Sequence, residues 1–152
     1  MTGAFKRAWA EVVQPMFSRP RRLQVAALCC KQTEKGERVL LITSRDTGRW
    51  ILPKGWPIDG LTAPDAALQE AWEEAGVKKA HIRRTPVGSY EYDKILEGGV
   101  PVPVDVQVYR VDVDKLADAY PEADERTRRW VSPAEAAELV DEDSLKDLLR
   151  QM

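Results

Sequence analysis

Three glutamates in the middle of the chain are the residues best suited to chemistry. Glu70, Glu73 and Glu74 stand at i, i+3 and i+4, so a helix would place all three carboxylates on one face. Within that helix no basic residue lies three or four positions away, and only Lys78, beyond it, could pair with Glu74. Carboxylate oxygens on a rigid element are ligands that Mg²⁺ or Mn²⁺ prefers. The pattern indicates either a divalent-cation site or a solvated acidic face.

The neighbouring residues predict the helix that would carry these glutamates. Thr62 is a suitable N-cap, and Gly76 can adopt the left-handed conformation that ends a helix. Leu68, Trp72 and Ala75 repeat at i, i+4 and i+7 on the other side. We therefore expect these three side chains to face the core.

The stretch from Gly55 to Val77 resembles the Nudix box, the signature of the Nudix hydrolases. That signature is a glycine, five residues, a glutamate, seven residues, and then Arg-Glu-apolar-x-Glu-Glu-x-Gly-apolar. Two positions depart from it: Leu61 stands where the first glutamate is expected, and Gln69 where the arginine is expected. We expect Leu61 to be partly buried, with Leu61 and Gln69 replacing a charged pair by a less polar contact. The matching positions are Gly55, Glu70, Ala71, Glu73, Glu74, Gly76 and Val77.

The resemblance implies a fold and an activity. The fold would be of the α/β class, a Nudix-type α/β/α sandwich with a mixed β-sheet. The activity would be Mg²⁺-dependent (or Mn²⁺-dependent) hydrolysis of a phosphoanhydride bond. By position, Glu70, Glu73 and Glu74 would hold the metal, and Glu70 would also be the catalytic residue, as general base or as the group that orients the attacking water.

Further segments resemble the diphosphoinositol-polyphosphate and diadenosine-polyphosphate hydrolases. That branch holds its polyphosphate with basic residues around the end of the sheet. Carried over by position, the substrate-binding candidates are Arg45, Lys54 and Gly55, while Arg22 and Lys94 are candidates from charge alone. The segments that carry this resemblance are Ser44-Arg45, Trp50 to Gly55, Arg126 and Trp130.

Two classes of function remain open. The first is a hydrolase of nucleoside diphosphate-X, (di)phosphoinositol or dinucleoside polyphosphate substrates. The second is a catalytically weak Nudix domain that binds a nucleotide or polyphosphate without cleaving it, an alternative motivated by Leu61 and Gln69. An assembly protein that uses its N-terminal segment is a third interpretation. Capped RNA ends are a less attractive substrate because the composition has no basic excess.

The composition is that of an ordinary globular protein. The chain has 152 residues, 43% of them hydrophobic and 32% charged, with a net charge of −2. This balance argues against bulk binding to nucleic acid or to a membrane, so the expected partner is a phosphorylated small molecule, with a homodimer left open. Cys29 and Cys30 are adjacent in an apolar run and are expected to be free thiols. With neither a signal-peptide pattern nor a membrane-spanning run, we expect a cytoplasmic protein.

The order of elements predicts one domain over residues 21–152 after a lead-in segment over 1–20. The lead-in has apolar residues at helical spacing. Valines alternate from 100 to 108 and then change phase, which predicts a β-bulge near Tyr109 and Arg110. Strands are predicted over residues 23–31, 38–44, 50–52, 81–95, 100–113 and 126–131, and helices over 62–76 and from 132 to 149, with a break at 141–143.

A few other polar and aromatic residues are assigned no function. His81 has no catalytic motif around it, and the tyrosines of the strands are expected to serve packing. Some family members take an additional base or metal ligand from late loops. Here a plain acidic surface loop is the favoured interpretation for Glu122, Asp124 and Glu125.

Overall fold

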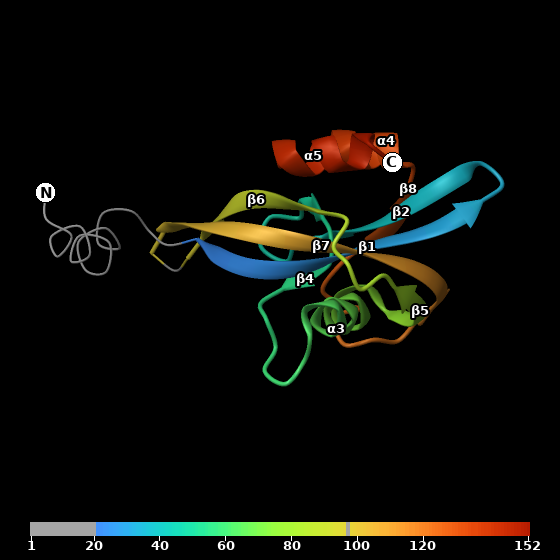
Figure 1. Ribbon diagram of the computed structural model, residues 1–152, viewed down its shortest axis with the longest axis horizontal. Coiled ribbons are helices and arrows are strands. Elements are labelled where there is room, and N and C mark those ends of the chain that lie inside the picture. Colours follow the sequence, from blue (N-terminus) through green and yellow to red (C-terminus); the bar gives the residue numbers. More distant parts are fainter. Residues whose placement is uncertain (1–20, 97) are drawn as a thin grey trace, which may run out of the picture.

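Two long parallel strands form the centre of the fold. In the computed structural model, which describes residues 21–96 and 98–152, β1 (Arg22–Thr33) runs beside β7 (Pro101–Leu116) (Figure 1). Their register extends from Arg22 opposite Val104 to Cys30 opposite Asp112. All other strand pairs are antiparallel, so the sheet is mixed. The remaining strands are β2 (Gly36–Thr43), β3 (Trp50–Ile51), β4 (Lys54–Gly55), β5 (Val77–Ile82), β6 (Gly88–Ile95) and β8 (Arg128–Val131).

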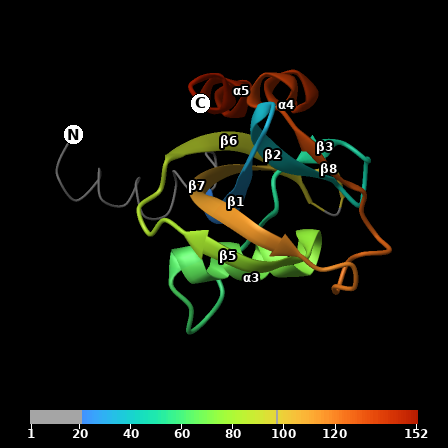
Figure 2. The same ribbon diagram turned by 90° about the vertical axis from the view of Figure 1, so that its right-hand side faces the viewer.

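Helices cover both faces of this sheet. Helix α3 (Ala63–Ala75) lies on one face, and α4 (Pro133–Leu139) and α5 (Asp143–Arg150) lie on the other (Figure 2). The predicted α/β/α sandwich with a mixed sheet is confirmed. In the described part of the chain, no helix is long and apolar enough to cross a membrane. The predicted lead-in segment, residues 1–20, lies outside the described residues.

The strand predicted over residues 81–95 is in fact two strands. β5 pairs with the second half of β7, where Ile82 lies opposite Val111, and β6 pairs with the first half, where Gly88 lies opposite Val108. The connection between them contains Pro86, which has no amide hydrogen to donate to a sheet. β5 and β6 therefore pair with different parts of the same strand, β7.

The change of phase along β7 is not a bulge at Tyr109. The register between β1 and β7 runs unbroken through this position, and the shifts in the sheet lie between β5 and β7 near Lys79. Val106 and Val108 belong to the core under α4 and α5, whereas Tyr109 and Val111 belong to the core under α3. The alternation of apolar residues changes phase because the first part of β7 buries apolar side chains under α4 and α5, and the second part buries them under α3.

Helix α3 begins and ends as predicted. The Thr62 hydroxyl accepts a hydrogen bond from the Asp65 amide at 3.3 Å, and Gly76 has a φ of 72° in the left-handed region. The face turned to the sheet consists mainly of alanines, including the predicted Ala75. Leu68 only packs against the edge of this core, and Trp72 lies on the outer flank of the helix, so the prediction for Trp72 is wrong. Small side chains let the helix lie close to the strands.

Candidate active site

The six residues predicted to form the site all line one cavity. It has a volume of about 760 Å³ and lies between the glutamate face of α3, strand β4, the β2–β3 loop and the end of β6. The structure therefore brings together residues from segments that are far apart in the sequence. The predicted site residues on its wall are Arg45, Lys54, Gly55, Glu70, Glu73 and Glu74.

Glu70 packs directly on the backbone of β4. A Cβ atom added to Gly55 would lie 2.4 Å from the Glu70 carboxyl carbon, far inside van der Waals contact. Strand β4 is held in place by its pairing with β1, where Lys54 lies opposite Ala26. Because glycine has no side chain, the Glu70 carboxyl can lie directly against the strand at this position.

Glu70 and Glu74 form an acid pair joined by a side-chain hydrogen bond. Glu74 is 4% exposed, and Glu70 is half-buried. Burial raises the pKa of both carboxyls, and the hydrogen bond to Glu70 raises the pKa of Glu74 further. The hydrogen bond between the two carboxyls thus raises the pKa of Glu74 and opposes the rise in the pKa of Glu70.

Arg126 brings the only guanidinium, among the described residues, that contacts this acid pair. Its Nη2 atom lies 3.3 Å from Glu74 Oε1 and 3.0 Å from Glu122 Oε1, and its Nη1 atom donates to the Thr43 carbonyl at 3.0 Å. The Arg126 side chain is only 8% exposed. This arginine belongs to the segments that carry the family resemblance, but its place in the sequence does not indicate a function.

Glu122 corrects the prediction of a plain surface loop. Its carboxylate lines the cavity, pairs with Arg126 and lies 3.5 Å from Arg45 Nη1. The spacing of four residues between Glu122 and Arg126 was the available signal in the sequence. Of the three acidic residues of that loop, Glu125 also lies 3.5 Å from Arg45.

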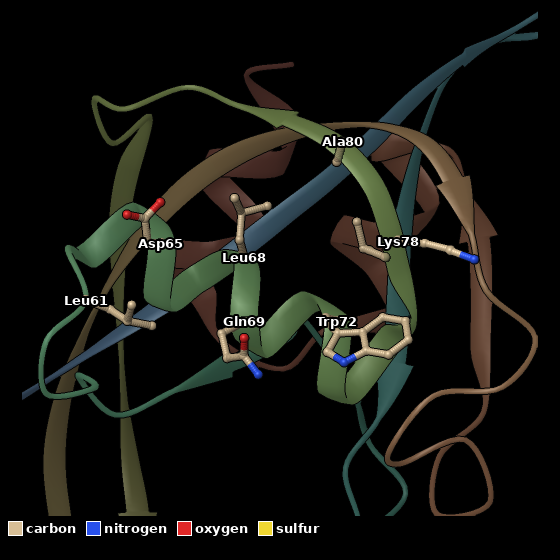
Figure 3. Close-up of a pocket in the computed structure, with 8 residues that line it drawn as sticks. Leu61, Asp65, Leu68, Gln69, Trp72, Lys78 and Ala80 are labelled. Carbon is tan, nitrogen blue, oxygen red and sulfur yellow. The ribbon is translucent and has the colours of Figure 1, made fainter.

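Glu73 is held by Gln69, one of the two residues that depart from the Nudix box. Gln69 Nε2 donates to Glu73 Oε1 at 2.9 Å, which orients the carboxylate without neutralising it. The second departure, Leu61, is 43% exposed, so the expectation that it is partly buried is wrong. Leu61, Gln69 and Trp72 line a separate cavity of about 560 Å³ on the outer flank of α3 (Figure 3).

The donor set suits a hard divalent cation in its chemistry. Three carboxylates share one wall of the cavity, and the buried Glu74 lies against the half-buried Glu70 without a full counter-charge. As the side chains stand, no three His, Cys, Asp or Glu residues in 21–96 and 98–152 are disposed to hold an ion. Glu73 is bonded to Gln69, and Glu74 faces Arg126. Binding would thus require these carboxylates to turn from their present partners.

Lys54 supplies a positive charge that is not committed to a carboxylate. Its ammonium makes no ion pair with any residue that the structure describes, and it lies 5.1 Å from the centre of the Tyr92 ring. The Tyr92 hydroxyl in turn donates to Gln24 Oε1 at 2.6 Å, which fixes the ring. Burial lowers the pKa of Lys54 to about 8. An ammonium in this setting is suited to binding a phosphate oxygen.

The other candidates divide between the cavity and the rest of the fold. Lys94 lines the cavity, whereas Arg22 is exposed on β1 and is not among the residues on its wall. His81 has an 81% exposed side chain and lies 3.2 Å from Asp114, away from the cavity. Of the tyrosines, Tyr90 and Tyr109 are buried in the two cores as expected.

A family model described as NUDIX domain matches residues 22–152 of this chain. The chain belongs to the Nudix family. Nudix hydrolase 13, mitochondrial, of Arabidopsis thaliana is 34% identical over 128 residues, which cover 76% of this chain and 61% of the relative. Nudix hydrolase 21, chloroplastic, of the same plant is 33% identical over 113 residues, covering 73% of this chain and 54% of the relative. This Nudix chain therefore spans only part of the length of the curated relatives it matches.

Solved structures share the fold of this Nudix domain. The C. elegans Ap4A hydrolase superposes with a TM-score of 0.62 at 18% identity, covering 87% of this chain and 96% of that one. The NUDIX domain of Shewanella oneidensis NrtR, complexed with ADP ribose, superposes with a TM-score of 0.64 at 18% identity. That match covers 99% of this chain and 98% of the other. At such low identity these likenesses establish the Nudix fold alone.

Proposed function

We propose that this Nudix domain is a Mg²⁺-dependent (or Mn²⁺-dependent) pyrophosphohydrolase. Its substrate would be a nucleoside diphosphate-X, (di)phosphoinositol or dinucleoside polyphosphate. The observation that carries the proposal is the shared cavity, in which the acid pair Glu70–Glu74 lies together with the uncommitted ammonium of Lys54. This reaction needs carboxylates that bind a cation and a positively charged side chain that binds the phosphate chain.

Each residue of the cavity has a proposed part in the reaction. Glu70, Glu73 and Glu74 hold the divalent ion, which when bound neutralises charge on the departing phosphate and lowers the pKa of water. Glu70, which packs against the backbone of Gly55, takes a proton from the attacking water or orients it. Lys54 binds phosphate oxygens, and Arg45 would bind them by exchanging its present partners, Glu122 and Glu125, for phosphate.

The proposal is tested by a phosphate-release screen over nucleotide-X, dinucleoside polyphosphate and inositol pyrophosphate compounds, with and without Mg²⁺. Glu70→Gln should lower kcat by about 10²–10⁴-fold, the usual contribution of a general base, while substrate affinity stays nearly unchanged. Lys54→Ala should mainly raise KM, because the ammonium binds the phosphate chain in the ground state as well. Equal kcat values for the wild-type protein and Glu70→Gln would refute the assignment.

The second candidate is a Nudix domain that binds its ligand without cleaving it. The neutral Gln69 beside Glu73 and the exposed Leu61 favour it, because the box lacks two of its charged positions. In that case metal-saturated protein would release no phosphate from any compound in the screen, and calorimetry would still detect binding of a nucleotide or polyphosphate.

The setting of the protein is proposed from the same observations. We infer a domain over residues 21–152 preceded by a lead-in segment, and the family match, which begins at residue 22, supports that boundary. A cytoplasmic location and a phosphorylated small-molecule partner, without membrane or nucleic-acid binding, remain our proposals. Homodimer formation is a separate proposal, which gel filtration tests.

A further inference from the structure

An apolar wall lies at the cavity beside the phosphate-binding candidates. Trp56 follows Gly55 directly and is 37% exposed, and Ile95, at the end of β6, is 63% exposed. Both line the same cavity, together with Ile58. Single exposed apolar side chains are ordinary, but this group gathers on a concave surface that also holds charged residues.

The position of Trp56 is linked to the acid pair by the chain itself. Its neighbour Gly55 abuts the Glu70 carboxyl, and successive Cα atoms are about 3.8 Å apart. Lys94 extends its ammonium to 6.0 Å from the centre of the Trp56 ring, which places a positive charge at the edge of the apolar wall. A ligand with phosphates between Glu70 and Lys54 would thus bring its next chemical group to the indole.

The charges of the cavity limit what that group can be. Six carboxylates and five basic side chains line it, so the wall carries no excess of positive charge. Arg45, Arg49 and Arg126 are already paired with carboxylates. Among the described residues, only the ammoniums of Lys54 and Lys94 line the cavity without an ion pair. Two free cations suit a short phosphate chain better than a ring that carries phosphates on every side.

We propose that Trp56 stacks on the base of a nucleotide, which makes the substrate class a nucleoside polyphosphate or nucleoside diphosphate derivative. This inference rests on the proposed function and chooses between the substrate classes that it leaves open. A nucleobase presents a flat π face that stacks on an aromatic ring, whereas an inositol ring has none. Lys94 steadies the indole and faces the first phosphate, and Ile95 and Ile58 flank the base.

The test is calorimetric binding to the full chain in the presence of Mg²⁺. The probes are ADP, inorganic tripolyphosphate and inositol hexakisphosphate, and the variants are Trp56→Ala and Trp56→Phe. Trp72→Ala is the matched control, because Trp72 is a half-buried tryptophan on the wall of the other cavity. Trp56→Ala should weaken ADP binding about 5- to 100-fold and leave tripolyphosphate binding unchanged. Trp56→Phe should retain most of the affinity, and Trp72→Ala all of it.

Several results would overturn the stacking. They are an unchanged ADP affinity in Trp56→Ala, an equal loss for ADP and tripolyphosphate, no ADP binding by the wild-type protein, or tighter binding of inositol hexakisphosphate than of ADP. In the last case a hydrolase acting on inositol pyrophosphates would still satisfy the proposed function. Conversely, Trp56-dependent ADP binding without phosphate release from any compound would retain the stacking and refute the hydrolase.

Discussion

Adding one methyl group at Gly55 should separate the stability of this Nudix domain from its activity. In Gly55→Ala the new Cβ would lie 2.4 Å from Glu70 Cδ and 2.5 Å from its Oε1 atom. Ordinary contacts begin at about 3.4 Å, so the carboxyl must move by about 1 Å. A shift of that size in a reacting group typically lowers the rate about 10²-fold.

The free energy of unfolding should change far less, by about 1 kcal/mol or less. Gly55 does not have a positive φ, so alanine fits the backbone, and its lower entropy in the unfolded chain contributes about 0.4–1 kcal/mol of stability. Crowding against Glu70 opposes this gain but is relieved by rotation of a flexible side chain. Urea unfolding measures the free energy of unfolding, and phosphate release with saturating Mg²⁺ measures kcat.

Gly88→Ala provides the matched control. A Cβ there would lie 2.6 Å from Leu148 Cδ1, on the far side of the sheet, so it should reduce stability and leave kcat unchanged. If Gly55 acts through Glu70, adding Gly55→Ala to Glu70→Gln should lower kcat little further. Wild-type kcat in Gly55→Ala, or additive losses in the double variant, would refute the reasoning.

Two further predictions follow from the charges of the cavity. Glu74→Gln should raise the free energy of unfolding at pH 8 without metal by roughly 1–3 kcal/mol, measured by urea unfolding, because it removes a buried carboxylate whose pKa is raised in the folded state. A carboxyl whose pKa is raised in the folded state lowers the stability of the wild-type protein as the pH rises above about 4.5, so the stability gained by Glu74→Gln should vanish in acid. A Glu74→Gln variant less stable than the wild-type protein at pH 8 would contradict this. Because the pKa of Lys54 is lowered to about 8, calorimetry should show tripolyphosphate affinity falling from pH 7 to pH 9, and Lys54→Arg should abolish that part of the fall. The same pH dependence in both proteins would assign the titration to another group.

Local signals in the sequence predicted much of the fold. The cap at Thr62 and the left-handed Gly76 depend on hydrogen bonds within a few residues, and both are found. The hairpin between β1 and β2 and the cap at Ser132, whose Oγ accepts from the Glu135 amide at 3.1 Å, likewise depend on residues close together in the sequence. The resemblance to the Nudix hydrolases also predicted six site residues, and all six line one cavity.

The rest depends on contacts between distant segments. Arg126 reaches the site because its guanidinium bonds to the Thr43 carbonyl, 83 positions earlier in the chain, and no local pattern encodes that approach. The split of the strand after α3 depends on which half of β7 each part meets. Trp72 looked like a core residue from its spacing, but the close packing of alanines on β1 left it at the flank.

The central pairing of β1 with β7 also determines when the site can exist during synthesis. Arg22 lies opposite Val104, so the segment between these strands, including all three box glutamates, forms one loop closed by that pairing. A ribosome therefore releases the acidic helix well before the strand that completes the sheet above it, and Arg126 emerges later still. The growing chain carries the box sequence for some time without the cavity that would give it chemistry.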